Sequence, residues 1–327
     1  MAARDLKALP KAHLHLHLEG GMRPGTLADL ADGYGVPVPQ IRGFGSFSVF
    51  ASTYLAACDV LRTEADFARL IDETLDDAVD SGAAWIEVAF HPAHHRPRFG
   101  TDEQIIQMVL AAMAAATART GVGASLMVSA DRTKPPADAI ELAELATRYA
   151  DRGVVAFGLA NDEELGAPEP YAEAYAIARA GGLLSTPHAG ELCGPDSVRG
   201  ALDALGADRI QHGVRAVEDP DLVQRLADQG VCLDVCPTSN LSLGVVDRLA
   251  DHPLPALLAA GVPCSINADD PLLFGPGLLE EYELCRAELG LDDTALAAVA
   301  TASIAHSAAP PDLKATALAA IAAWLTD

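Results

Sequence analysis

The chain has 327 residues, half of them hydrophobic, which is enough for two average domains or one large barrel with a buried core. Its formal net charge is −24, so nucleic acids and anionic membranes, which are negatively charged themselves, are poor partners. The N-terminal residues lack the apolar core of a signal peptide, and no apolar run is long enough to cross a bilayer. The six cysteines form no CxxC motif. Together these features predict a cytoplasmic protein with reduced cysteines.

Strands and helices are predicted to alternate along most of the chain. Residues 11–18 (KAHLHLHL) alternate strictly between polar and apolar positions, which predicts a first strand. A short helix to about residue 34 and an irregular excursion over residues 35–62, with a helix near 50–61, follow it. This excursion is the natural candidate for a lid over a bound substrate.

The remainder of the chain is more regular. Seven further strands are predicted at 84–90, 124–129, 154–159, 183–187, 209–212, 231–235 and 263–267. The helices between them are predicted at 64–81, 101–121, 136–151, 169–180, 195–205, 220–229 and 253–260, and three C-terminal helices at 278–289, 294–307 and 312–325.

This alternation predicts parallel strands, and eight strand–helix units predict a closed (β/α)8 TIM barrel in the α/β class. We expect a single domain over residues 1–327, with extra helices after the first strand and at the C-terminus. A doubly wound open sheet is the structural alternative, but the phosphate-binding motifs GxGxxG and GxxxxGK[ST] are missing.

Polar side chains cluster just after the predicted strands. The C-terminal ends of barrel strands share one face, so these side chains are expected to meet. They are His15 and His17 on the first strand, His188 after the fifth, His212 after the sixth, and Asp269 and Asp270 after the eighth.

The histidines of the first strand indicate a metal site. His13, His15 and His17 lie on one face of the strand, and His13 is predicted to be a deeper core residue. An isolated HxH motif is more often an exposed polar ladder, but in a barrel this face points inward, where imidazoles need a partner such as a metal. With His188 and Asp269, the pair His15 and His17 makes a set of three histidines and one carboxylate that suits Zn²⁺ with an open position.

Three further residues can carry catalysis. His212 can act as a base or as an electrostatic partner of a zinc-bound hydroxide, and Asp270 can hydrogen-bond the metal-bound water. Glu191, if apolar surroundings keep it protonated, can donate a proton. As isolated motifs, HxxE is more often a surface turn and an Asp pair before Pro271 is commonly a helix cap.

Five segments, in this order, resemble the motif set of the adenosine deaminase family, which belongs to the amidohydrolase superfamily of metal-dependent barrels. They are HLHLEG at 15–20, HAGE at 188–191, QHG at 211–213, CPTSN at 236–240 and SINADDP at 265–271. The resemblance covers nearly the whole chain. It implies hydrolytic deamination at C6 of adenosine, or of a close 6-aminopurine nucleoside, to an inosine-type product and ammonia.

The resemblance also implies the roles of individual residues. One Zn²⁺ ion per chain would be bound by His15, His17, His188 and Asp269. Glu191 would protonate N1 of the purine, while His212 and Asp270 would orient the attacking hydroxide. The substrate-binding residues would be His17, Glu19, Asn161 and Asp270.

Two departures from the family pattern concern the substrate. Glu19 stands where the family usually has Asp, whose carboxylate faces the ribose, and this form also occurs in branches that act on free adenine or other nucleosides. Residues 158–163 (GLANDE) resemble the family's DLAGDE, with Asn161 in place of the glycine whose N–H meets purine N3. Adenine is therefore an alternative substrate.

Other functions are weighed against this one. Loop 91–98 (HPAHHRPR) is either an exposed basic loop or a specificity loop. As a specificity loop it would fit a 6-amino-6-deoxyfutalosine deaminase of menaquinone biosynthesis, the main alternative function, with Arg96 or Arg98 meeting the benzoate of that nucleoside. A cytidine-type deaminase is excluded because HxE…PCxxC is missing.

No lysine follows the fourth strand to bridge two metals, so one metal is expected. A nucleoside-binding pseudoenzyme is the non-enzymatic alternative, and the oligomeric state is left open.

Overall fold

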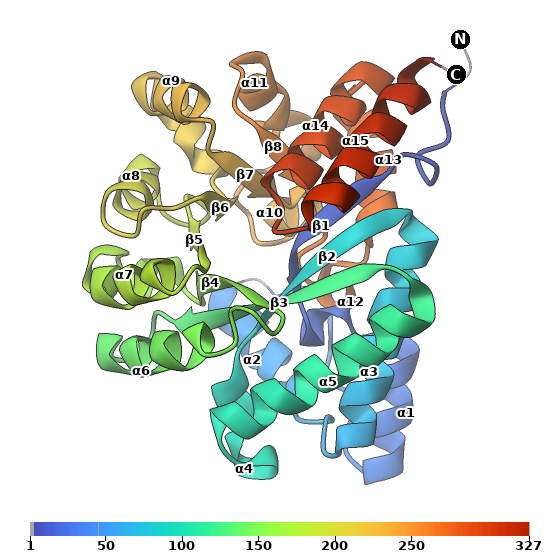
Figure 1. The fold of residues 1–327 in the computed structure, drawn as a ribbon, viewed down its shortest axis with the longest axis vertical. Helices are drawn as coiled ribbons and strands as arrows, with labels where there is room; N and C mark the ends of the chain where they lie inside the picture. Colours follow the sequence, from blue (N-terminus) through green and yellow to red (C-terminus); the bar gives the residue numbers. More distant parts are fainter. Residues whose placement is uncertain (1–2, 45, 327) are drawn as a thin grey trace.

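Eight parallel strands follow one another around a barrel in the computed structural model, which describes residues 3–44 and 46–326 (Figure 1). Each strand pairs with the next along the chain, which confirms the predicted (β/α)8 TIM barrel. The strands are β1 (Lys11–His17), β2 (Ala83–Phe90), β3 (Gly123–Asp131), β4 (Val154–Ala160), β5 (Leu184–Ala189), β6 (Arg209–His212), β7 (Cys232–Val235) and β8 (Cys264–Ile266).

The seam between β8 and β1 is joined by residues that follow β8. The side-chain oxygen of Asn267 accepts hydrogen bonds from the backbone N–H groups of Leu14, at 2.7 Å, and His15, at 3.1 Å. Asp269 donates its N–H to the carbonyl of His15 and accepts from the N–H of His17. The backbone that carries Asp269 is thereby fixed directly against the strand that carries His15 and His17.

Helices surround the barrel and add to it at the predicted places (Figure 1). Extra helices follow β1, and α14 lies against β1 and β8 while α15 packs on α14. The longer helices are α1 (Pro24–Tyr34), α2 (Phe47–Cys58), α3 (Glu64–Ser81), α5 (Asp102–Thr120), α6 (Pro136–Thr147), α7 (Ala172–Ala180), α8 (Pro195–Asp203), α9 (Pro220–Gln229), α13 (Leu278–Glu288), α14 (Asp293–His306) and α15 (Pro311–Thr326). The short helices are α4 (Arg96–Phe99), α10 (Pro237–Ser242), α11 (Leu254–Ala259) and α12 (Pro271–Phe274).

Local sequence signals explain where the helices begin and end. Thr101 and Gln104 form the capping box at the start of α5, at the predicted position. Helix α2 begins and ends three residues earlier than predicted, because Ser46 caps it by accepting from the N–H of Val49. Helices α4, α10 and α12 were not predicted, since four to six residues are too few to show a helical period.

The barrel interior holds a buried charge cluster. Arg209 donates to Glu87 at 2.6 Å and to Asp234 at 3.0 Å, and all three side chains are at most 1% exposed. A buried guanidinium with two carboxylate partners satisfies charges that would otherwise be costly there. Among the helices of the described ranges, none combines the length and apolar character needed to cross a bilayer.

Candidate active site

The predicted site residues converge at the C-terminal ends of the strands. Seven of them line one cavity: His17, Asn161, His188, Glu191, His212, Asp269 and Asp270. Helix α2 contributes Phe47, Phe50, Ala51, Tyr54 and Leu55 to the same cavity, so part of the predicted lid lies over it. His15 is fully buried beside it, and Glu19 lies outside its lining.

The backbone is strained at this cavity. Within the described residues, three non-glycine residues have positive φ: Asn161 at 80°, His212 at 65° and Asp269 at 59°. All three line the cavity. Such conformations cost free energy in L-residues and cluster where a side chain must be aimed at a functional site. Asn161 occupies the position where the family has glycine, and asparagine tolerates this conformation better than most residues.

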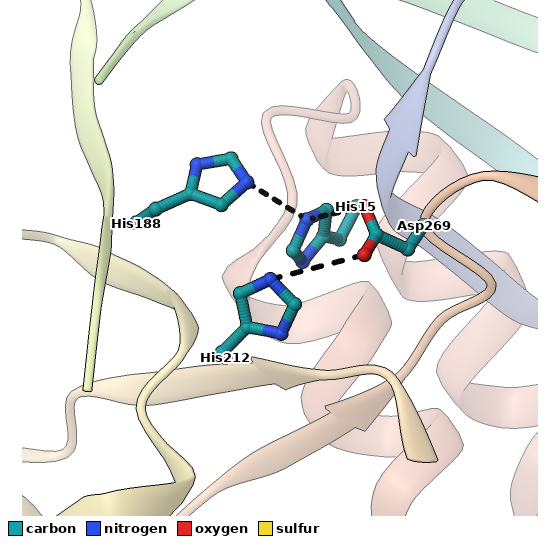
Figure 2. A group of neighbouring side chains, drawn as sticks. All are labelled: His15, His188, His212 and Asp269. Carbon is teal, nitrogen blue, oxygen red and sulfur yellow. Dashed lines mark hydrogen bonds and ion pairs between the residues drawn. The ribbon is translucent and has the colours of Figure 1, made fainter. Parts of the chain in front are cut away.

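Four side chains bring their metal-binding atoms together (Figure 2 shows three of them, with His212). Nε2 of His188 lies 3.2 Å from Nε2 of His15 and 3.3 Å from Nε2 of His17. Oδ1 of Asp269 lies 3.2 Å from His15 Nε2 and 3.3 Å from His17 Nε2. Ligands at 2.0–2.1 Å from a tetrahedral Zn²⁺ ion lie about 3.3–3.4 Å apart, so these separations fit such an ion.

Hydrogen bonds at the far side of two rings fix which nitrogen faces inward. Nδ1 of His15 lies 3.1 Å from the carbonyl of Asp234, and Nδ1 of His188 lies 3.0 Å from the carbonyl of Leu159. A carbonyl only accepts, so both Nδ1 atoms carry a proton, and in the neutral form of each ring Nε2 presents a lone pair. Two lone pairs 3.2 Å apart repel each other unless a cation lies between them. The donor set therefore fits a divalent metal.

His212 belongs to the same cluster but contacts it differently. One potential ligand atom from each of four residues lies within 4.8 Å of the others: His15, His188, His212 and Asp269. The same holds for His17, Asp269 and Asp270. Nε2 of His212 is 3.9 Å from Asp269 Oδ2 and 3.4 Å from Glu191 Oε1. His212 therefore lies between the metal-binding atoms and the predicted proton donor.

The tautomer of His212 follows from a chain of contacts that begins at the backbone. The N–H of Leu254 donates to Nδ1 of His252 at 3.1 Å, so the proton of His252 is on Nε2, which lies 3.1 Å from Asn240 Oδ1. The amide nitrogen of Asn240 then donates to Nδ1 of His212 at 3.2 Å. Burial and the nearby His15 lower the pKa of His212 well below its usual value. Neutral His212 thus presents its Nε2–H to the cavity.

Two of the acidic groups that line the cavity, Glu191 and Asp270, have raised pKa values. Burial, reinforced by Asp269 and Glu163, raises the pKa of Glu191 well above its ordinary value. Burial likewise raises the pKa of Asp270 well above its ordinary value. Glu191 Oε1 and Asp270 Oδ1 are buried and have no hydrogen-bond partner among the described residues. Unpaired buried oxygens at one cavity fit a site whose partners arrive with the substrate.

Asp270 is also held by close packing. A Cβ atom placed on Gly20 would lie 1.8 Å from Asp270 Oδ1 and 2.9 Å from Asp270 Cα. Only glycine leaves room for the carboxylate at this point, which explains Gly20 of the first motif in physical terms.

Glu163, for which no role was predicted, anchors the loop that carries Glu191. Its carboxylate accepts hydrogen bonds from four consecutive backbone N–H groups, those of residues 190–193, at 2.6, 3.0, 2.7 and 2.8 Å. The hydroxyl of Ser197 donates to the same carboxylate. The sequence signal was the acidic end of the GLANDE stretch, which contains Glu163 but does not indicate its partners.

Glu19 is not among the residues that line the cavity. Its side chain is fully buried, with Oε1 2.6 Å from Nε2 of His95 and Oε2 accepting from the hydroxyl of Tyr54 at 2.8 Å. These contacts, above all that with His95, lower the pKa of Glu19 to about 2 despite its burial. Tyr54 lines the cavity in its place.

The arginines of loop 91–98 are engaged elsewhere. Arg96 forms a two-point contact with Asp102 at 2.6 Å, and Arg98 contacts Asp59 at 3.1 Å. Neither arginine lines the cavity, whereas His91 and His94 of the same loop do.

The sequence and the fold are both similar to those of known deaminases. The sequence matches the adenosine deaminase family over residues 10–324. A Streptomyces virginiae protein with the provisional name adenosine/adenine deaminase is 48% identical over 335 residues, 99% of each chain. An adenine deaminase structure from Arthrobacter aurescens superposes with a TM-score of 0.91 at 32% identity, covering 98% of this chain and 100% of that one. A zinc-bound amidohydrolase from Burkholderia ambifaria gives 0.89 at 28% identity, covering 98% and 94%.

The family match spans nearly the whole chain, and the barrel and its clustered histidines and carboxylates agree with it. The chain therefore belongs to the adenosine deaminase family and is a hydrolytic deaminase of an aminopurine.

Proposed function

We propose that this chain removes the amino group from C6 of a 6-aminopurine, with one Zn²⁺ ion held by His15, His17, His188 and Asp269. The observation that carries the proposal is the convergence of imidazole lone pairs and a carboxylate oxygen at 3.2–3.3 Å. The zinc bound by the Burkholderia ambifaria protein supports the choice of ion. When bound, such an ion acts as a Lewis acid and lowers the pKa of water to about 7.

The protein groups around the ion move the protons. Glu191, with its raised pKa, holds a proton at neutral pH and delivers it to N1 of the purine. The N–H of His212 holds the attacking water, and Asp270 takes the proton that the water loses. The oxygen bonds to C6, the C6–N bond breaks, and the amino group leaves as ammonia with the proton held by Asp270. The proton that remains on the oxygen returns to Glu191 as the C6=O bond forms. The sum is purine plus water giving the 6-oxopurine and ammonia.

Among 6-aminopurines we propose free adenine as the preferred substrate. In the resemblance to adenosine deaminases, the carboxylate at position 19 faces the ribose. Here both oxygens of Glu19 are occupied by His95 and Tyr54, and Tyr54, rather than Glu19, lines the cavity. A ribose would lose that carboxylate partner, whereas a free base does not need it. The Arthrobacter aurescens structure, an adenine deaminase, supports this choice.

Adenosine, the substrate that the motifs alone favoured, is the second candidate. The name of the Streptomyces virginiae protein includes both activities. The contacts of Arg96 with Asp102 and of Arg98 with Asp59 lend no support to 6-amino-6-deoxyfutalosine, whose carboxylate would need a free guanidinium.

Glu191→Gln tests the proposed chemistry. An amide has no proton to transfer to N1, so ammonia release should fall by about 10²–10⁴-fold or more while zinc content and adenine binding persist. Glu173→Gln, at an exposed glutamate of α7, is the matched control and should retain activity. Near-normal turnover by Glu191→Gln would remove Glu191 from the mechanism. Adenine binding with no turnover in the unmodified protein would favour a binding protein.

A further inference from the structure

Three more side chains with metal-binding atoms face the cavity and have no part in the proposed chemistry. His91 and His94 follow β2, and Asp131 ends β3, the neighbouring strand. One ligand atom of each lies within 4.8 Å of those of the other two, and all three residues line the cavity. They share no residue with the cluster of His15, His17, His188 and Asp269.

Asp131 is held so that one oxygen stays available. Its Oδ1 accepts from the N–H and the hydroxyl of Thr133, at 2.8 and 2.7 Å, and from the side-chain amide of Asn161 at 3.1 Å. These three donors fix the carboxylate on the cavity wall through Oδ1, and no donor within residues 3–44 and 46–326 forms such a contact with Oδ2. A carboxylate fixed in this way costs little further ordering when it binds a cation.

The two histidines have the form that binds metals. Their rings lie 4.5 Å apart with a tilt of 38°, and Nδ1 of His94 is buried without a hydrogen-bond partner in the part of the chain that the structure describes. Burial and the neighbouring His94 lower the pKa of His91 to about 3, and burial lowers the pKa of His94 as well. Both imidazoles are therefore neutral at pH 7, with lone pairs free for coordination.

We propose that His91, His94 and Asp131 form a second, weaker Zn²⁺ site on the wall of the substrate cavity. Two imidazoles and one carboxylate are a common protein ligand set for zinc with an open position. The site is weaker than the first because its atoms lie up to 4.8 Å apart and must be drawn together to about 3.4 Å. An ion there would narrow the cavity beside Asn161, so excess zinc should inhibit the enzyme.

The test counts zinc rather than products. Equilibrium dialysis of the metal-stripped protein against buffered Zn²⁺, with metal analysis, should show a tight equivalent and then a weaker one. His94→Gln and His91→Gln, which preserve side-chain size and polarity, should each weaken the second equivalent by at least about tenfold and keep the first. His306→Gln, at a half-buried histidine at the end of α14, is the control and should keep both.

Inhibition gives an independent readout. Added zinc should slow the unmodified protein at the concentrations that fill the second equivalent, and His94→Gln should shift this inhibition to higher zinc, relative to its own uninhibited rate. A single zinc equivalent in the unmodified protein would overturn the proposal. So would a second equivalent that survives in both histidine variants, because it would then lie elsewhere. Both outcomes concern metal binding, so they are separate from the fate of the proposed deamination.

Discussion

The amide nitrogen of Asn240 donates to Nδ1 of His212 at 3.2 Å, and this contact decides which nitrogen of His212 faces the cavity. The orientation of Asn240 is fixed in turn by His252, whose own tautomer is set by the N–H of Leu254. The sequence left open whether His212 is a base or an electrostatic partner. The contacts favour a hydrogen-bond donor, since its inward nitrogen carries the proton, and they leave Asp270 as the acceptor of the water's proton.

Asn240→Asp should reverse the tautomer of His212. A carboxylate accepts a hydrogen bond, so the imidazole proton would move to Nδ1 and the cavity would face a lone pair. We expect kcat to fall by about 10²–10⁴-fold with zinc content unchanged, as is typical when a catalytic histidine is held in the wrong tautomer. Steady-state kinetics and the ¹⁵N shifts of the His212 ring would measure both effects. His252→Gln can still donate to Asn240, so its kcat should fall far less. Equal losses of kcat in the two variants would argue against this series of hydrogen bonds.

Glu163→Gln should loosen the loop that carries Glu191. A neutral amide accepts hydrogen bonds only at its oxygen, so some of the N–H groups of residues 190–193 would lose their acceptor. We expect kcat to fall about 10–100-fold with a smaller change in KM, because misplacement of a proton donor affects the reaction more than binding. The exposed neighbour Glu164→Gln is the control. If both variants matched the unmodified protein in kcat and in its pH profile, Glu163 would have no positioning role.

Much of the fold and site was predictable because the signals are local and periodic. The eight strands and most helices follow from alternation and caps, as at Thr101, and their order implied the barrel. The convergence of the proposed metal-binding and catalytic residues at one cavity was predictable from their positions just after strands, together with the ordered motifs.

Supporting contacts were not predictable, because they join side chains through packing alone. Glu19 meets Tyr54 and His95, which are 35 and 76 residues away, and no pattern at position 19 indicates either. Glu163 reaches a loop 27 residues further on. The bounds of α2 were missed by three residues because its apolar residues do not mark its ends as clearly as Ser46 does.

Gly20→Ala should displace the Asp270 carboxylate, because the new methyl group would lie 1.8 Å from Oδ1. We expect a loss of about 1–3 kcal/mol of stability from the steric conflict and a large fall in kcat. Gly25→Ala in α1 makes a matched control, since a Cβ there meets nothing within 4 Å and alanine is the better helix former. Thermal unfolding and ammonia release would be compared for both variants. Equal behaviour of the two would show that Gly20 is not needed for room.

Glu281→Gln should stabilise the protein increasingly as pH rises. Burial raises the pKa of Glu281 from about 4.5 to about 8, so between these values the folded state binds more protons than the unfolded state. The carboxyl group therefore lowers the free energy of unfolding progressively across that range, and glutamine removes this loss. Urea unfolding at pH 5 and pH 8.5 should show the gain growing by a few kcal/mol, on the order of the 1.36 kcal/mol per pKa unit expected from linkage. A gain of the same size at both pH values would contradict the raised pKa.

The most direct measurement is ammonia release by the zinc-loaded protein with adenine and adenosine compared at equal concentrations. The proposal predicts that turnover requires zinc and that kcat/KM for adenine is at least about 100-fold above that for adenosine. A difference of this size is expected when a site offers no partner for the polar groups of the poorer substrate. Efficient turnover of adenosine would contradict the conclusion drawn from Glu19, Tyr54 and His95. Failure to release ammonia from either purine would contradict the proposed function itself.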